Sequence, residues 1–95
     1  MKKEDAVKFN ELRHSGIMTS GMMEYQNEEK AEKVIREIRR VLNGIAVSRS
    51  GNGILLRPIN NAQLKFLADI TGAYAWRIFP TTNTITHWRY NGSAR

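Results

Sequence analysis

The sequence contains no cysteine, and this absence excludes several kinds of chemistry at once. Without a thiol the protein has no disulfide, no cysteine nucleophile and no cysteine-ligated zinc or iron–sulfur site. Histidine is almost as scarce, because His14 and His87 are the only two, and neither has a pair of carboxylates near it in the sequence. A metal centre or acid–base catalysis is therefore not expected. We predict a protein that is not an enzyme and that has no metal and no cofactor.

Long hydrophobic runs are missing as well. No segment approaches the roughly 20 apolar residues that a membrane-spanning helix needs. The N-terminus becomes acidic at Glu4 and Asp5 and lacks the apolar stretch of a secretory signal. We therefore expect a cytoplasmic protein that does not associate with membranes. Its 95 residues, of which 41% are hydrophobic, are enough for one domain with a modest core.

Acidic residues are rare in the second half of the chain. Residues 44–95 contain six lysines and arginines and a single acid, Asp69, which gives a net charge of +5. Residues 1–43 contain nine basic and eight acidic residues, a balance of +1. A region with so few carboxylates favours a polyanion or an acidic protein surface as its partner. The alternative is a positive charge that serves solubility alone.

The clearest helical pattern covers residues 28–43, where apolar side chains recur at helical spacing and form one stripe. Asn27 is placed to cap the start, Arg39 and Arg40 suit the negative end of the helix dipole, and Gly44 is placed to end the helix. Acids alternate with bases on the opposite side of this helix. We interpret that side as a solvated face and not as a DNA-recognition surface, because the acids would repel phosphates.

A hairpin is predicted for residues 45–59, with its turn at Asn52-Gly53, because both of these residues tolerate the positive φ of a tight hairpin turn. Around that turn, Ser48 and Arg57 are expected to form a pair on one face. A second helix is predicted for residues 60–71, with an asparagine at position 60 or 61 as its cap and a glycine directly after it.

Residues 72–91 predict a second hairpin, with a turn at residues 81–83. The register that best separates apolar from charged side chains places Trp76 opposite Trp88. The other face of this hairpin then carries three basic residues: Arg77, His87 and Arg89.

The two tryptophans have two interpretations. As large aromatic side chains, Trp76 and Trp88 are expected in the core, facing the helices. The alternative places them on the exposed face of the sheet, where they would form a stacking platform for single-stranded nucleic acid. The sequence pattern does not decide between these faces.

The N-terminal part has weaker patterns. Residues 3–14 predict a short helix with a thin apolar stripe, and residues 15–23 are interpreted as a linker rich in glycine, serine and methionine. The predicted organisation is therefore an N-terminal arm over residues 1–23, one domain over residues 24–91, and a C-terminal tail over residues 92–95.

After the arm, the predicted order of elements is α-β-β-α-β-β. We predict an α+β fold in which a four-stranded antiparallel sheet carries two helices packed on one face. The run Ile54-Leu55-Leu56 is apolar on both alternating faces. We therefore expect that the N-terminal segment or a second chain covers part of the first hairpin, which leaves a homodimer open.

These patterns predict a small, basic nucleic-acid-binding protein that contacts phosphates through arginines on its two hairpins. The alternative is a small interaction protein, such as a phage-type or plasmid-type inhibitor, that binds an acidic surface of a nucleic-acid-processing host protein. The same binding residues are predicted for both functions: Arg49, Arg57, Arg77, His87 and Arg89.

Overall fold

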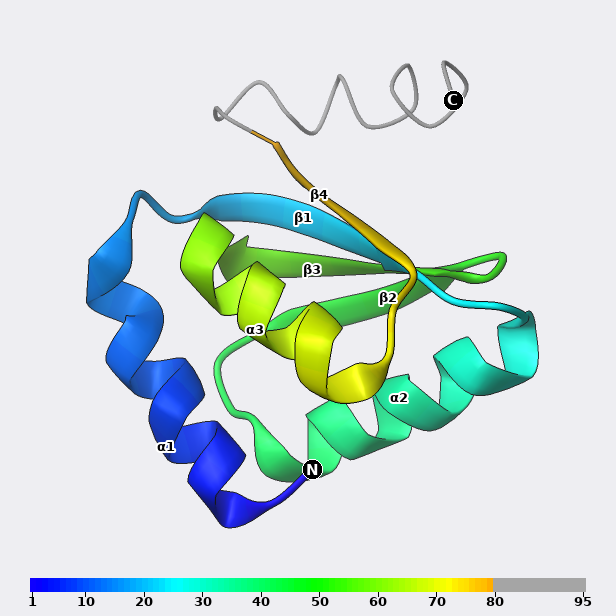
Figure 1. Cartoon of the computed structure of the whole chain (residues 1–95), viewed down its shortest axis with the longest axis horizontal. Coiled ribbons are helices and arrows are strands. Elements are labelled where there is room, and N and C mark those ends of the chain that lie inside the picture. Colours follow the sequence, from blue (N-terminus) through cyan, green and yellow to red (C-terminus); the bar gives the residue numbers. More distant parts are fainter. Residues whose placement is uncertain (80–95) are drawn as a thin grey trace.

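The structure is a computed structural model and describes residues 1–79 (Figure 1). In chain order its elements are α1 (Lys3–Glu11), the 3₁₀ turn η1 (Leu12–Ser15), β1 (Thr19–Glu24), α2 (Glu28–Val41), β2 (Ala46–Ser50), β3 (Gly53–Ile59), α3 (Asn61–Thr71) and β4 (Ala75–Phe79).

The four strands form one antiparallel sheet in the order β2-β3-β1-β4. The predicted α+β class and the predicted four-stranded antiparallel sheet are therefore confirmed. From β1 to β4 the chain follows the order β-α-β-β-α-β, and β1 and β2 are separated in the sheet by β3. This connectivity is the split βαβ arrangement that is also called ferredoxin-like. A topology of this kind supports many different functions, so function has to be argued from the side chains.

The linker prediction for residues 15–23 is wrong at its C-terminal end. Thr19–Glu24 forms strand β1, which lies at the centre of the sheet between β3 and β4. The segment contains Ser20 and Gly21 and few β-branched residues, so its own strand propensity is low. Its extended conformation is stabilised by pairing with a strand on each side, and a single sequence window does not contain that information.

The predicted order of elements also needs correction, because the fourth strand of this sheet is β1 and not the second strand of a C-terminal hairpin. The predicted turn at residues 81–83 and the strand after it lie outside the described residues. Residues 1–23, which were expected to form an arm, contribute Phe9 to the core as well as most of β1.

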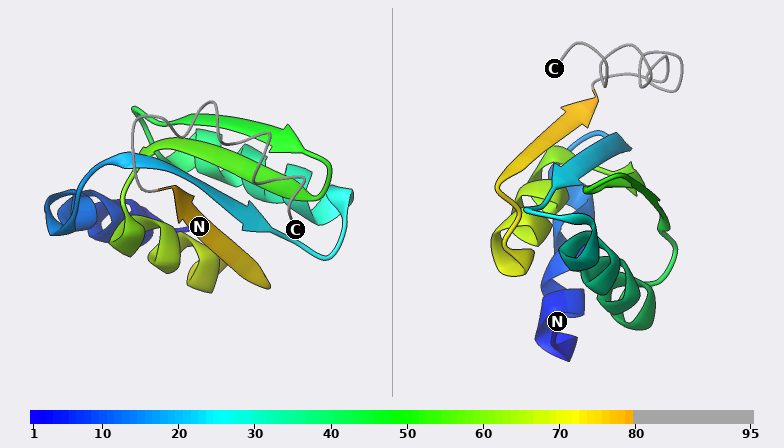
Figure 2. Two further views of the ribbon diagram at one scale, coloured as in Figure 1. Left: turned by 90° about the horizontal axis from the view of Figure 1, so that it is seen from above. Right: turned by 90° about the vertical axis from the view of Figure 1, so that its right-hand side faces the viewer.

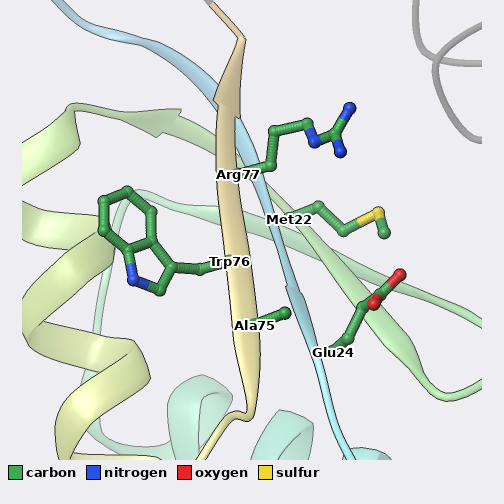
Figure 3. A pocket seen from close by; sticks show the side chains of 5 residues that line it. All are labelled: Met22, Glu24, Ala75, Trp76 and Arg77. Atoms are coloured by element: carbon green, nitrogen blue, oxygen red, sulfur yellow. The ribbon is translucent and has the colours of Figure 1, made fainter. Parts of the chain in front are cut away.

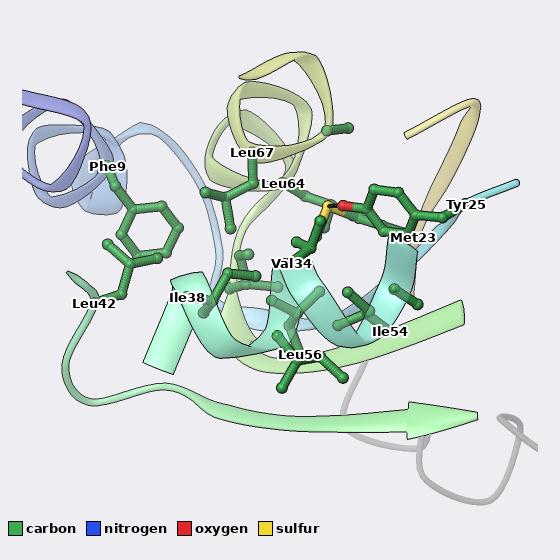
Figure 4. Close-up of a cluster of buried hydrophobic side chains, with 14 residues drawn as sticks. Phe9, Met23, Tyr25, Val34, Ile38, Leu42, Ile54, Leu56, Leu64 and Leu67 are labelled. Carbon is green, nitrogen blue, oxygen red and sulfur yellow. Dashed lines mark hydrogen bonds between the residues drawn. The ribbon is translucent and has the colours of Figure 1, made fainter. Parts of the chain in front are cut away.

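Both α2 and α3 pack on the same face of the sheet, as predicted (Figure 2). The core lies between these helices and the two central strands (Figure 4). Its fully buried members include Ile38 of α2, Leu64 and Leu67 of α3, and Ile54 and Leu56 of β3. The helix-facing side of the sheet is therefore filled by apolar side chains.

The predicted helix caps are largely confirmed. The Asn27 side chain accepts a hydrogen bond from the Lys30 backbone at 2.8 Å and begins α2. That helix ends at Val41, two residues earlier than predicted, and Leu42 and not the predicted Gly44 is its C-terminal cap. Asn60 caps α3, and Gly72 ends it with a φ of 76°, in the left-handed region that favours glycine.

The turn of the first hairpin lies one residue earlier than predicted. Ser50 pairs with Gly53, so the two turn residues are Gly51 and Asn52. Gly51 has a φ of 62°, and a glycine at the first central position is the pattern of a type II′ turn. The Asn52 side chain donates a hydrogen bond to the Tyr25 carbonyl at 2.6 Å, and this contact holds Asn52 against the segment that joins β1 to α2.

Candidate functional site

The sheet has one face that none of the described helices covers (Figure 2), and we call it the open face. Side chains alternate along a strand, so the strand register determines which residues belong to this face. They are Ser20, Met22 and Glu24 of β1, Ala46, Ser48 and Ser50 of β2, Leu55 and Arg57 of β3, and Ala75, Arg77 and Phe79 of β4. Ser20, Met22 and Phe79 are buried, so the other residues form the accessible part of this face.

Arg77 belongs to a row of residues that crosses the whole sheet. It lies opposite Met22 of β1, Met22 lies opposite Leu55 of β3, and Leu55 lies opposite Ser48 of β2. The row therefore begins with a cation on the outer strand and continues with two apolar side chains on the central strands. Met22 is buried and Leu55 is partly buried, so they form a low apolar surface beside the arginine.

The Arg77 guanidinium is exposed and extends away from the sheet (Figure 3). Within residues 1–79 it makes no hydrogen bond or ion pair. An exposed guanidinium without a protein partner retains all five of its N–H donors for a ligand. Arg77 is therefore the side chain of the open face that is best placed to bind an external anion.

Arg57 is the second arginine of the open face. It is exposed, and it lies opposite Ala46 of β2. Because β1 separates β3 from β4, Arg57 and Arg77 are two strand spacings apart, a lateral distance of about 10 Å. The two guanidinium groups can therefore reach different anionic groups of one extended ligand.

A shallow hollow of about 80 Å³ lies beside Arg77. Arg77, Met22, Ala75 and Glu24 extend toward the same side, whereas the Trp76 indole points to the opposite side of the strand (Figure 3). The hollow thus has an apolar floor between a guanidinium and a carboxylate. Glu24 is the single acidic side chain of the open face as defined above.

Arg49 does not belong to the open face. It lies opposite Ile54, whose side chain is in the core, so Arg49 extends toward α2. There its guanidinium contacts Glu28 at 3.1 Å and Glu32 at 3.2 Å. The sequence could have indicated this position of Arg49. Arg49 follows Val47 by two residues on the same strand, so both side chains lie on the same face of the sheet.

Trp76 lies on the side that its core interpretation predicts, but it is not buried. Its side chain lies on the helix-facing side of β4, so it is not part of a stacking platform on the open face (Figure 3). It is nevertheless 37% exposed, because β4 is the outer strand of the sheet in residues 1–79 and α3 covers the indole only in part. The neighbouring Tyr74 is also exposed.

The remaining predicted residues cannot be located on this surface. His87 and Arg89 lie outside the described residues, and so does the predicted pairing of Trp76 with Trp88. The structure therefore brings together two of the five predicted binding residues, Arg57 and Arg77, and separates Arg49 from them.

Sequence reasoning missed Met22 and Glu24, because they belong to the segment that was interpreted as a linker. A signal was present in the alternation of this segment. Gly21, Met23 and Tyr25 face the core, and the residues between them face the other way. The pattern is hard to recognise because Ser20 and Gly21 are small and because Met22 and Met23 are equally apolar.

Two further observations concern only the described part of the chain. Among residues 1–79, no three histidine, aspartate or glutamate side chains come together in a way that could hold a metal ion. In the same residues, no helix is both long enough and apolar enough to cross a lipid bilayer.

The fold and this surface define a small α+β protein with a split βαβ sheet and one open, arginine-bearing face. No protein-family model, curated protein sequence or solved structure matches the chain.

Proposed function

We propose that the protein binds nucleic acid, without catalysis, through the open face of its sheet. The observation that carries the proposal is the position of Arg57 and Arg77, which are both exposed on the one face that the described helices leave uncovered. Guanidinium groups form paired hydrogen bonds with phosphate oxygens, and a strand holds them in fixed positions. Arg77 is the stronger candidate, because it has no partner among residues 1–79.

His87 and Arg89 remain part of the proposed site as sequence-based expectations. A cytoplasmic location would give such a protein access to nucleic acid. The positive charge of residues 44–95 would assist binding, because each neutralised phosphate releases condensed counterions.

The test is fluorescence anisotropy with labelled single-stranded and double-stranded oligonucleotides of equal length over a series of salt concentrations. We expect binding that weakens steeply with salt. The double variant Arg57→Ala/Arg77→Ala should bind about tenfold more weakly or worse, because it loses two charge-assisted contacts. Its salt slope should fall by about 1.4, which is about 0.7 for each of two lost phosphate contacts on a single strand.

The matched control is Lys33→Ala/Arg40→Ala, which removes the same charge from the exposed side of α2. If this control weakens binding as much as the open-face variant does, net charge and not the open face would be responsible. If no oligonucleotide binds at low salt, the proposed function is wrong.

A second candidate function is binding to another protein, and a different observation favours it. Ile70, Tyr74 and Trp76 are exposed apolar side chains on α3, on the loop before β4 and on β4 itself. Apolar and aromatic side chains of this kind are typical of protein interfaces. A pull-down from a nuclease-treated lysate should then retain one defined protein, and Tyr74→Ser/Trp76→Ser should release it. Loss of the partner after nuclease treatment alone would contradict direct protein contact.

A further inference from the structure

We propose that a second hollow, between α2 and β2, binds a phosphate group. We call it the α2–β2 hollow, and it has a volume of about 170 Å³. Its walls are formed by residues of two elements: Glu32, Ile35, Arg36 and Arg39 of α2, and Arg49 of β2. This inference does not rest on the proposed nucleic-acid binding, because the two arginines of the open face do not line the hollow.

The hollow has three guanidinium groups because two elements direct arginines to the same place. On α2, Arg36 and Arg39 are three residues apart, and residues at this spacing are neighbours on a helix surface. On β2, Arg49 extends toward α2, because its side chain lies on the helix-facing side of the strand. Ile35 is buried and gives the hollow an apolar base.

The two acids near these arginines are paired with Arg49. Its Nη1 lies 3.1 Å from Glu28, and its Nε lies 3.2 Å from Glu32. A hydrogen bond from Nη1 to the Gly51 carbonyl at 2.9 Å adds a third contact. These contacts fix the Arg49 guanidinium in position and place both carboxylates against it. Three arginines and two acids leave one net positive charge (3 − 2) at the hollow.

Arg39 is also held in place, but it retains most of its donors. Its Nη2 donates one hydrogen bond to the Val47 carbonyl at 2.9 Å. A guanidinium has five N–H donors, so four (5 − 1) have no partner within residues 1–79. Arg36 is exposed, and its contact with Glu32 at 3.9 Å is longer than a hydrogen bond. Both arginines of α2 can therefore direct paired N–H groups at an anion.

A phosphate fits this arrangement better than a carboxylate does. The guanidinium groups come from a helix and a strand, so they approach the hollow from different directions. A phosphate presents its oxygens tetrahedrally to several donors, whereas a carboxylate presents two oxygens in one plane. A volume of about 170 Å³ is roughly that of five or six liquid waters at about 30 Å³ each. This space admits a tetrahedral anion together with some of its bound water.

The expected form of the ligand is a phosphate monoester or free phosphate. An internal phosphodiester has only two free oxygens and one charge, so it would leave some of the donors without a partner. Two sources supply a monoester: a small phosphate compound, and the terminal phosphate of a nucleic-acid strand. Both present the same group to the arginines. Because Arg39 and Arg49 are fixed before the ligand arrives, binding costs them little conformational freedom.

The first experiment is an NMR titration of the ¹⁵N-labelled full chain with sodium phosphate at constant ionic strength. Sodium chloride is the comparison. We expect the side-chain Nε–Hε signals of Arg36, Arg39 and Arg49 to shift and reach saturation with phosphate and not with chloride.

The variant Arg36→Ala/Arg39→Ala should bind phosphate about tenfold more weakly or worse, because it loses two charge-assisted contacts. Its matched control, Lys33→Ala/Arg40→Ala, removes the same charge from the same helix outside the hollow and should change the affinity by less than about twofold. Arg39→Lys keeps the charge and loses the planar fork. It should also weaken binding, which separates the role of the fork from that of net charge.

A second experiment distinguishes the two sources. Anisotropy compares 5′-phosphorylated with 5′-hydroxyl oligothymidine of equal length, and thymidine 5′-monophosphate is titrated by NMR. If the strand end is the source, the phosphorylated strand binds more tightly, and Arg36→Ala/Arg39→Ala removes this difference. If a small compound is the source, the monophosphate shifts the three arginine signals while both strands bind equally. Either result supports a phosphate site in the hollow.

Two outcomes would overturn the inference. The first is a phosphate titration that gives no saturable shift of the three arginine signals. The second is a control variant that weakens phosphate binding as much as Arg36→Ala/Arg39→Ala does. Neither outcome touches the proposed function, which depends on the binding of the 5′-hydroxyl strand to the open face. Conversely, failure of that strand to bind rejects the proposed function and leaves the phosphate site intact.

Discussion

Gly21 is a residue at which strand β1 and helix α3 approach each other closely. A Cβ atom built at this position would lie 2.6 Å from Leu64 Cδ2 and 3.2 Å from the Arg77 carbonyl oxygen. Leu64 is fully buried in the core and the carbonyl belongs to the neighbouring strand, so neither has free space to move into. The absence of a side chain at Gly21 thus determines how closely α3 approaches β1.

We predict that Gly21→Ala destabilises the protein by about 1–3 kcal/mol, the usual cost of an added methyl group in a packed core. Gly16→Ala is the control, because its Cβ would meet Asn60 at 3.6 Å, an ordinary contact distance. Urea denaturation of both variants measures the difference in the free energy of unfolding. Equal stability of the two variants would contradict the close approach at β1.

Tyr25 is a fully buried tyrosine with a polar partner. Its hydroxyl lies 2.6 Å from Thr71 Oγ1, and that oxygen in turn donates to the Leu67 carbonyl. Burial raises the pKa of Tyr25 to about 12, although the hydrogen bond with Thr71 acts in the opposite direction. The protein therefore favours the neutral phenol in the folded state.

The pKa of an unfolded tyrosine is about 10, so the folded state holds this proton more tightly. The stabilisation is complete below about pH 10 and is lost as the pH rises toward about 12. We predict that Tyr25→Phe removes the latest step from an absorbance titration of the tyrosines. The variant should also lose stability less steeply than the unaltered protein above pH 10. A titration that is unchanged by Tyr25→Phe would contradict the raised pKa.

Trp76 provides a test of which face binds the ligand. Because its side chain lies on the helix-facing side of β4, we expect Trp76→Phe to change nucleic-acid affinity by less than about twofold. Arg77→Ala, at the next residue of the same strand, should weaken binding strongly. Anisotropy with one single-stranded oligonucleotide compares the two variants. A loss of tenfold or more with Trp76→Phe would show that the base contacts lie on the other face.

At the scale of the elements, the helices were predictable and strand β1 was not. Both helices carry their own signals: an asparagine cap at the start of each and, for α3, a glycine directly after its end. These signals act over three or four residues, so a sequence window contains them. β1 depends on pairing with residues 29 (53 − 24) to 59 (79 − 20) positions later in the chain, and so do the positions of Met22 and Glu24. The sequence alone therefore did not show that Met22 and Glu24 belong to the candidate site.

Asn60 joins η1 and α3 through one buried side chain. Its Oδ1 accepts from the Gln63 backbone at 2.8 Å and caps α3. Its Nδ2 donates to the carbonyls of Leu12 and Arg13 at 2.8 and 3.1 Å, and thereby holds η1 against α3. The neighbouring Gln63 adds a hydrogen bond to the Phe9 carbonyl at 3.0 Å.

We predict that Asn60→Ala costs about 2–4 kcal/mol of unfolding free energy, because it removes a cap and leaves buried polar groups without partners. Asn27→Ala is the matched control. It removes the exposed cap of α2 and should cost about 1 kcal/mol. Urea denaturation measures both values. If the two substitutions cost the same, the contacts of Asn60 with η1 would contribute nothing.

At the scale of the whole molecule, the positive charge of residues 44–95 is divided between surfaces. Arg49 pairs with two acids of α2, Lys65 lies on α3, and Arg57 and Arg77 reach the open face. The charge count correctly indicated a surplus of cations, but it did not show on which surface each basic side chain lies. For Arg49, the alternation of side chains along its strand was enough to assign the surface. For Arg57 and Arg77, the position of β1 in the sheet was also needed.

The central position of β1 also determines when the sheet can form during synthesis. Met22 pairs with Leu55, which is 33 residues later (55 − 22), and with Arg77, which is 55 residues later (77 − 22). Contacts between such distant residues slow folding, because a long loop must close before any of them forms. The first strand to leave the ribosome is thus the last to gain both of its neighbours. Until β4 has been synthesised, one side of β1 exposes unpaired backbone groups to other chains, and we expect aggregation to begin there.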